Sequence, residues 1–197
     1  FKKEFPMIKN IINSIFISLI LLFTLNAHAQ QFNSGGKNPT SDEVIYHFGY
    51  GSNMDEDYMR QFTPSLKFVT TAQLPNFEIQ FRKYSTDLEG GISSIIPKPG
   101  GLVQGVIHTI LKSEMEALDI LEDVPLGIYS RETFKVIAKD GTWYNADLYR
   151  VTNPKGPFTP SVKYLGLMIG GAKMHNINKP WIDYLENLRK NIIENQH

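Results

Sequence analysis

The sequence predicts an α+β domain with a small, largely antiparallel sheet that curls toward a barrel and carries packed helices. Two observations lead to this fold class. Short β-branched and aromatic segments, separated by Pro- and Gly-containing turns, occupy two stretches of the chain. Helical patterns follow each stretch, so the order is strands, a helix, strands and then helices, without the strict alternation typical of a parallel sheet.

The first group of strands is expected between residues 44 and 110. Residues 44–48 form a short candidate, and residues 66–81 carry enough β-branched and aromatic side chains for one or two strands. Residues 92–96 and 102–110 flank Pro97-Lys-Pro-Gly-Gly101, which we interpret as a hairpin turn.

A helix is expected next. Ser113 and Glu116 have the spacing of a capping box, in which both side chains bind exposed amides of the first turn. Met115, Leu118 and Leu121 supply an apolar stripe at helical spacing.

The remaining chain is predicted to form a second hairpin and two closing helices. Asp140 and Gly141 are a dipeptide typical of a two-residue hairpin turn, and Pro180 fits the first turn of the last helix. The expected strands are residues 129–138 and 142–151, and the expected helices are residues 161–173 and 180–194.

Composition excludes several functional classes. The 197 residues contain 20 basic and 20 acidic side chains and no basic run, so a nucleic-acid partner is not expected. There is no cysteine, which excludes disulfides, a thiolate nucleophile and a lipoprotein anchor. The five histidines show no i, i+4 pair. We therefore expect neither metal nor cofactor, although a metal site built from distant residues stays open.

Residues 1–29 resemble a secretory signal with a short upstream extension before Met7. Lys9 precedes an apolar run at residues 11–25, and Ala27-His28-Ala29 has the small-residue spacing of a cleavage site. The run of about 15 residues is shorter than the roughly 20 needed to span a bilayer. We expect export to the periplasm or the extracellular space after cleavage near Ala29, without stable membrane insertion. An uncleaved anchor is the alternative.

The mature chain is interpreted as one domain. Residues 30–42 are polar and rich in Asn, Gly and Ser, which indicates a flexible lead-in. Residues 43–197 contain no internal repeat and no second linker, so they form the domain itself. The sequence leaves the oligomeric state open, a homodimer included.

The loop from Gly49 to Asn53 is the first candidate site. A strand ending in Gly-x-Gly can present backbone N–H groups to an anion. A dinucleotide site is rejected because Met54 replaces the third glycine. Gly51 is expected to need a positive φ or a close ligand, and Ser52 lacks the context of a nucleophile. A tight turn without a ligand is the alternative.

Glu122 is the second candidate. At 100° per residue it lies about 40° from Leu118, on the same face as Met115. Burial and the carboxyl end of the helix dipole both raise a carboxyl pKa, which prepares a general base or acid near neutral pH. Asp123, at about 140°, should face away. If the helix frays before Glu122, the side chain is instead solvated.

The two candidates belong to an ordered set of short motifs, the first of which is His47-Phe-Gly-Tyr-Gly-Ser-Asn-Met54. This motif resembles the Y-G-S-N signature of the γ-glutamylcyclotransferase and AIG2-like superfamily. The other matching positions follow in order from about Ile45 to Leu188 and are Gly90-Gly91, Gly105-Val106, Leu118-Asp119, Glu122, Val124, Gly127, Tyr129, Tyr149, Pro160-Ser161, Tyr164 and Gly171-Ala172. Each motif alone is weak, whereas the ordered set is specific.

The resemblance implies a γ-glutamylcyclotransferase-like fold that cyclises a γ-glutamyl amino acid or amine to 5-oxoproline, a reaction of glutathione metabolism, and needs no cofactor. It implies Glu122 as the general acid/base. The implied binding residues of the small-molecule substrate are His47, Phe48, Gly49, Tyr50, Gly51 and Ser52, together with Tyr149. Alternatives are a non-catalytic binding module of this fold and a signal-anchored surface protein. The acceptor side of the substrate stays open, although the glutathione-specific branch ranks lower.

Two positions depart from the family pattern. Asp123 stands where glycine is common, and His47 stands where another aromatic residue is common. The export signal is also unusual for a family usually described as cytosolic.

Overall fold

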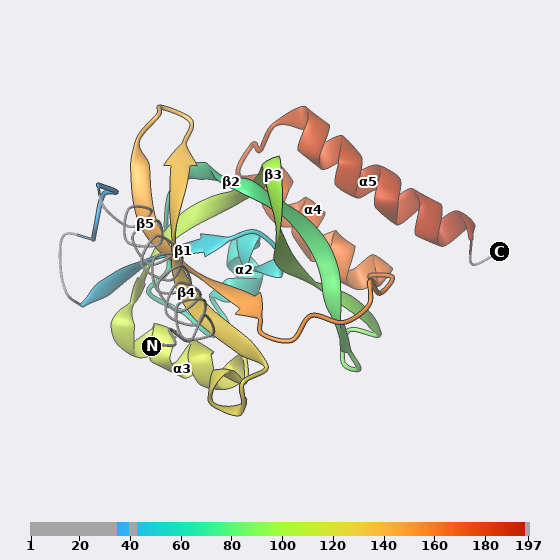
Figure 1. Ribbon diagram of the computed structural model, residues 1–197, viewed down its shortest axis with the longest axis horizontal. Coiled ribbons are helices and arrows are strands. Elements are labelled where there is room, and N and C mark those ends of the chain that lie inside the picture. Colours follow the sequence, from blue (N-terminus) through green and yellow to red (C-terminus); the bar gives the residue numbers. More distant parts are fainter. Residues whose placement is uncertain (1–34, 40–42, 196–197) are drawn as a thin grey trace, which may run out of the picture. The chain divides into compact units, whose positions relative to one another are not determined.

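Five strands close into a barrel within the described residues, 35–39 and 43–195, of this computed structural model (Figure 1). Their order is β1–β3–β2–β4–β5, and all neighbours are antiparallel except β1 and β5, which pair in parallel. The predicted α+β class with a largely antiparallel, curled sheet is confirmed. The strands are β1 (Val44–Gly49), β2 (Lys67–Ser85), β3 (Gly90–Leu111), β4 (Tyr129–Ala138) and β5 (Trp143–Val151).

Helices and short 3-10 turns connect and cover the barrel. The two closing helices pack against each other, and α4 also contacts the turn η1 that follows β1. Ser161 caps α4 and Asn178 caps α5 through their side-chain oxygens. The elements are η1 (Ser52–Met54), α2 (Glu56–Met59), α3 (Lys112–Leu121), η2 (Val124–Leu126), α4 (Val162–Met174) and α5 (Lys179–Glu194).

The hairpin turn expected at residues 97–101 is wrong. β3 runs through this segment as one long strand beside β2, and the chain reverses between Ser85 and Gly90 (Figure 1). The register of pairing with β2 jumps at the proline-rich segment itself: Pro75 faces Leu102, whereas Phe77 faces Pro97. The Pro- and Gly-rich residues therefore form a bulge, which suits prolines because they cannot donate to the ladder.

The capping box expected at the start of α3 is also wrong. The N-cap residue is Leu111, and it makes no side-chain capping bond. The Ser65 hydroxyl instead accepts a hydrogen bond from the Leu111 N–H at 3.1 Å, and the Glu114 carboxylate accepts one from the Ser65 N–H at 3.1 Å. Ser65, which is distant in sequence, thus binds the amide of the N-cap residue, and Glu114 in the first turn holds Ser65 in place.

The second hairpin follows the sequence prediction closely. β4 begins and ends at the expected residues, and Gly141 has a φ of +85° in the turn that leads to β5. Residues 36–38, which the sequence assigns to the lead-in, run beside β5, where the Lys37 N–H donates to the Trp143 carbonyl at 2.7 Å.

The buried apolar residues form two clusters. The larger one fills the barrel and includes Phe48, Tyr50 and Tyr164, and the smaller one lies against α3 and includes Tyr129 and Tyr149. The tyrosines of both clusters meet again at the site described below.

The secretory signal predicted at residues 1–29 lies outside the described residues. Among the helices that the structure does describe, none is long and apolar enough to cross a bilayer.

Candidate active site

A cavity of about 100 Å³ opens where the two apolar clusters meet. Aromatic side chains dominate its wall, and one carboxylate faces it. The lining residues are His47, Phe48, Tyr50, Gly51, Ser52, Asn53, Tyr58, Leu88, Ile92, Ser93, Glu122, Tyr129, Tyr149 and Tyr164. The mixture of apolar walls and a few convergent polar groups is typical of a small-molecule site.

Gly51 lies at the point where the loop after β1 touches β3 and α4. A Cβ on Gly51 would stand 2.3 Å from the Ser93 Oγ and 2.7 Å from the Tyr164 hydroxyl. Its φ is −109°, which excludes a positive φ, one of the two reasons expected for a glycine here. Glycine is required here because two neighbouring hydroxyls occupy the space of a side chain.

Tyr164, in the first turn of α4, ties the loop to the barrel. Its hydroxyl lies 2.7 Å from the Ser93 Oγ and accepts a hydrogen bond from the Ser93 N–H at 3.2 Å. It also accepts one from the Ser52 backbone N–H. Part of the amide array expected to bind an anion is therefore held around a tyrosine oxygen at the cavity wall.

Tyr50 and Tyr149 form another part of the wall. The Tyr50 hydroxyl donates to the Tyr149 carbonyl at 2.6 Å, which joins the β1 loop to β5. The Tyr149 hydroxyl donates to Asp119 Oδ1 at 2.8 Å, and Asp119 pairs with Arg131 Nε at 2.9 Å. This chain of contacts fixes the Tyr149 ring through α3 and β4.

Glu122 is brought to the cavity by the end of α3. Met115 and Leu118 are buried as the helical spacing predicts, whereas Leu121 is 52% exposed, contrary to expectation. Glu122 is the C-cap residue, and Asp123 then turns the chain with a φ of +53°. A left-handed conformation is uncommon for residues other than glycine, and aspartate is among the residues that adopt it most readily.

The environment of Glu122 favours its protonated form. Burial raises the pKa of the Glu122 carboxyl to about 7, against the opposing effects of the Lys83 charge and a hydrogen bond from the Asn53 side chain. The charge of Asp123, which does not line the cavity, raises this pKa further. A carboxyl group with a pKa near neutrality can both accept and return a proton.

His47 lies in the barrel wall beside the cavity. It is 1% exposed, and burial, with the charge of Arg131 adding to it, lowers the pKa of the His47 imidazole to about 4. The ring is therefore neutral at pH 7 and acts as an uncharged part of the wall.

The cavity gathers most of the residues that the sequence singled out. His47, Phe48, Tyr50, Gly51, Ser52, Glu122 and Tyr149 all line it. Gly49 does not, and it is instead packed so closely that a Cβ would stand 2.3 Å from the Asn53 carbonyl oxygen.

Sequence reasoning placed Asn53 in the candidate loop but missed its action on the Glu122 carboxyl, and it missed Lys83, which acts on the same group. It also missed that Ser93 and Tyr164 hold the loop. Tyr164 belongs to the matching family positions, so its place in that set was a usable signal. Ser93 and Lys83 carry no local pattern.

These features define the chain as a small barrel protein with a carboxyl-bearing, tyrosine-lined small-molecule site. Residues 102–187 match the AIG2-like family. A human γ-glutamylcyclotransferase is 32% identical over 163 residues, which cover 80% of this chain and 85% of that protein. The mouse protein of the same name is 30% identical, with 76% of this chain and 81% of that protein covered. The chain belongs to the γ-glutamylcyclotransferase family.

A solved structure leads to the same family. A γ-glutamyl cyclotransferase structure superposes with a TM-score of 0.68 at 30% identity, over 75% of this chain and 87% of that one. The homologues at this level of identity are thus γ-glutamylcyclotransferases, and the chain has their barrel fold.

Proposed function

We propose that this protein is a γ-glutamylcyclotransferase that converts a γ-glutamyl amino acid or amine to 5-oxoproline and the free amino acid or amine. The observation that carries the proposal is the placement of Glu122 at the tyrosine-lined cavity with a pKa of about 7. Family membership supports the same reaction.

In the proposed reaction Glu122 acts first as a base. Its carboxylate takes a proton from the α-ammonium of the substrate, and the freed amine attacks the γ-carbonyl carbon to form the five-membered ring. The protonated Glu122 then returns the proton to the leaving nitrogen while the original amide C–N bond breaks. The ring nitrogen gives up its second proton through the same carboxylate to the released amine, which leaves as an ammonium ion. Nucleophile and carbonyl belong to one molecule, so little further entropy is lost in bringing them together.

The wall of the cavity supports binding of the γ-glutamyl head group. The loop from His47 to Ser52 forms one side of this space, and Tyr149 lines it as well. Tyr164 and Tyr50 hold this loop against β3 and β5 before any substrate arrives. A loop that is already ordered loses less entropy when it binds.

The volume of the cavity indicates which part of the substrate it can hold. About 100 Å³ is small beside the roughly 300–1,000 Å³ of a site that encloses a drug-sized ligand. We therefore place only the glutamyl part inside. Leu88 borders both this cavity and a second hollow of about 820 Å³ along residues 84–89 and 158–163, and the amine part would extend there.

The test is a substrate panel. The purified protein is incubated with γ-glutamyl amino acids, γ-glutamyl amines and glutathione, and 5-oxoproline and the released amine are measured. We expect both products in equal amounts from at least one of the first two classes. Saturable binding of these compounds without 5-oxoproline would instead identify a non-catalytic binding module, and neither binding nor turnover would reject a small-molecule role.

We also propose that the protein is exported after cleavage near Ala29, on the basis of the charged and apolar pattern of residues 1–29. N-terminal sequencing of the protein made from its natural gene should give a mature end near Gln30 in a periplasmic or extracellular fraction. A soluble cytoplasmic protein that still carries Met7 would reject export.

A further inference from the structure

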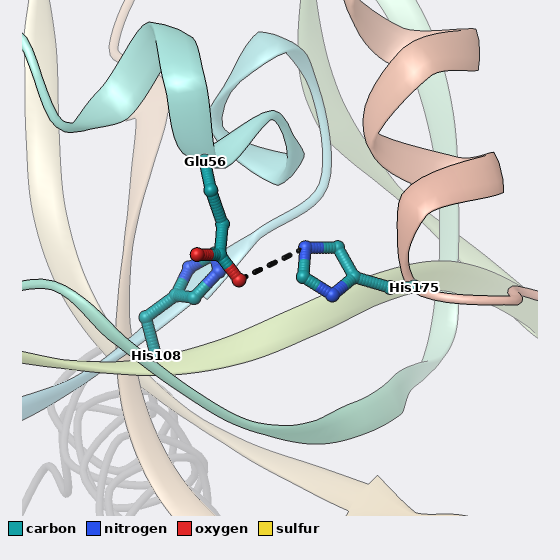
Figure 2. A group of neighbouring side chains, drawn as sticks. All are labelled: Glu56, His108 and His175. Atoms are coloured by element: carbon teal, nitrogen blue, oxygen red, sulfur yellow. Dashed lines mark ion pairs between the residues drawn. The ribbon is translucent and has the colours of Figure 1, made fainter.

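A second polar cluster lies outside the cavity and joins three separate parts of the fold. Glu56 comes from α2, His108 from β3, and His175 follows the last turn of α4 (Figure 2). One side-chain nitrogen or oxygen from each residue lies within 4.8 Å of the other two. None of the three lines the cavity at Glu122.

His108 is buried in a way that calls for a ligand. It is 0% exposed, and neither ring nitrogen has a hydrogen-bond partner among the described residues. Buried polar groups are paired in the large majority of cases, because leaving them without a partner costs stability. An ion bound to one of these nitrogens would supply the missing partner.

His175 presents a defined nitrogen to the same place. Its ring makes a hydrogen bond to the Met54 backbone, and since Nε2 has no hydrogen-bond partner, this bond belongs to Nδ1. Nε2 points toward Glu56 Oε1 at 3.6 Å, the contact drawn as a dashed line in Figure 2. A backbone carbonyl that holds one ring nitrogen while the other faces the ion is the usual support of a metal-binding histidine.

Glu56 is oriented from its outer side. Arg60 Nη2 binds Glu56 Oε2 at 2.6 Å, which leaves Oε1 directed at the two imidazoles. The Phe68 ring stacks on His175 with ring centroids 4.4 Å apart and shields the group from solvent. The cluster therefore has three donors, an outer set of supporting contacts and an apolar cover.

We propose that Glu56, His108 and His175 bind a divalent first-row transition-metal ion, for which Zn²⁺ is the best fit. Two imidazole nitrogens and one carboxylate oxygen are ligands that suit Zn²⁺, whereas Mg²⁺ and Ca²⁺ prefer oxygen ligands alone. Bonds of about 2.0–2.1 Å require donor atoms about 3.4 Å apart in a tetrahedral site. The three donors, which lie within 4.8 Å of one another, would move toward the centre to reach that spacing, and water would complete the coordination.

The bound ion would hold α2 and the end of α4 against β3. α2 directly follows the loop that lines the cavity, so the ion would stabilise this part of the fold without touching the proposed catalytic groups. We expect a structural ion that raises the melting temperature and leaves the turnover of the metal-free protein largely unchanged.

The experiment begins with the full chain freed of metal by a chelator and dialysis. Zn²⁺ is added, and the bound metal is measured by elemental analysis together with the melting temperature. We expect one ion per chain and an increase of about 5–10 °C when free Zn²⁺ is a hundred times its Kd. Co²⁺ in place of Zn²⁺ should give the visible absorption of a low-symmetry nitrogen and oxygen site.

The variants Glu56→Gln and His175→Gln test the assignment of the ligands. His108 is not replaced, because it is so deeply buried that a substitution would disturb folding. Each should lose the ion and the stabilisation by Zn²⁺ while it keeps near-normal 5-oxoproline release, if the protein has that activity. Asp57→Asn is the matched control, since Asp57 is an exposed carboxylate on the same helix. Equal Zn²⁺ binding by the parent chain and both ligand variants, or no change of melting temperature with Zn²⁺, would overturn the proposal.

Discussion

The cavity at Glu122 and the Glu56–His108–His175 cluster both place a carboxylate beside buried polar groups, but they are built differently. One short segment, from His47 to Asn53, supplies six of the residues that line the cavity, all but Gly49 of the segment, whereas each ligand of the cluster comes from a separate segment. The two regions adjoin, because His47 and His108 are paired across β1 and β3. A continuous run leaves a motif in the sequence, and a convergence of single side chains leaves none.

The largest expected effect is the loss of turnover in Glu122→Gln, which separates the two regions most clearly. Glutamine keeps the shape of the side chain but cannot take the ammonium proton. Loss of a general base costs about 10²–10⁴-fold in rate, so kcat for 5-oxoproline release should fall by at least about 100-fold.

Two variants serve as controls for this assignment. Asp123→Asn changes a neighbouring carboxylate outside the cavity and should keep most of the maximal turnover, and Glu56→Gln should do the same. If Asp123→Asn is the inactive variant, or Glu122→Gln turns over normally, Glu122 is not the base.

Gly51→Ala should disturb the cavity through packing. The added Cβ meets the Ser93 and Tyr164 hydroxyls, and inserting a methyl group into a filled space costs about 1–3 kcal/mol of unfolding free energy. KM should rise as the loop is displaced.

Gly166→Ala is the control. A Cβ at this position of α4 meets nothing within 4 Å, so the variant should gain up to about 1 kcal/mol of unfolding free energy. Urea unfolding and substrate titration measure both, and equal stability of the two variants would exclude the packing explanation.

The pH at which kcat/KM rises should depend on the residues that surround the Glu122 carboxyl. The base must be deprotonated, so activity should rise with pH through about 7. Asn53→Ala removes a hydrogen bond that favours the carboxylate, so the rise should move to higher pH. Asp123→Asn removes a negative charge, so the rise should move to lower pH. Shifts in the same direction would contradict this account of the site, and the Glu56→Gln profile should stay in place.

The smallest expected effect is on stability. The Glu122 carboxyl has its usual pKa of 4.5 in an unfolded chain and a pKa of about 7 in the folded protein. Folding therefore favours its protonated form, and the stability that this form contributes is fully present below pH 4.5 and is lost as pH rises through 7. Glu122→Gln lacks this loss. Its stability relative to the parent chain should therefore be greater at pH 8 than at pH 5, by on the order of 1 kcal/mol for a partly accessible group.

Melting temperatures at both pH values provide the measurement, and about 2–4 °C is expected for this chain length. Glu116→Gln, at an exposed position of α3, is the control. An advantage of Glu122→Gln that is the same at pH 5 and pH 8 would show that the carboxyl pKa is not raised by folding.

The sequence predicted those parts of the fold whose signals are local. The Asp140-Gly141 turn and the periodicity of Met115 and Leu118 led to correct elements, because hairpin dipeptides and helical stripes act over a few residues. The segment at residues 97–101 was wrongly predicted as a hairpin turn, because bulges and hairpin turns contain the same types of residue. Only the pairing with β2 distinguishes them.

The candidate site shows the same division: its locally encoded parts were predicted, and its long-range contacts were not. Glu122 was located by its helical position, and the cavity loop by its glycines. The roles of Asn53, Lys83 and Ser93 depend on contacts between distant segments, which no spacing in the chain reports. The histidine pair at His108 and His175 escaped for the same reason, since its members meet only after the barrel and α4 are in place.

The pairing of β1 has a consequence for the order of folding. β2 with β3 and β4 with β5 are hairpins of neighbouring strands, whereas β1 pairs with β3 and β5 across long stretches of chain. The hydroxyl of Tyr50, the residue after β1, donates to a carbonyl 99 residues away. Contacts that close long loops form late, because their entropic cost is met only when both ends are already structured. We therefore expect β1 to join the barrel after the two hairpins have formed, so that the cavity is completed in the step that closes the barrel.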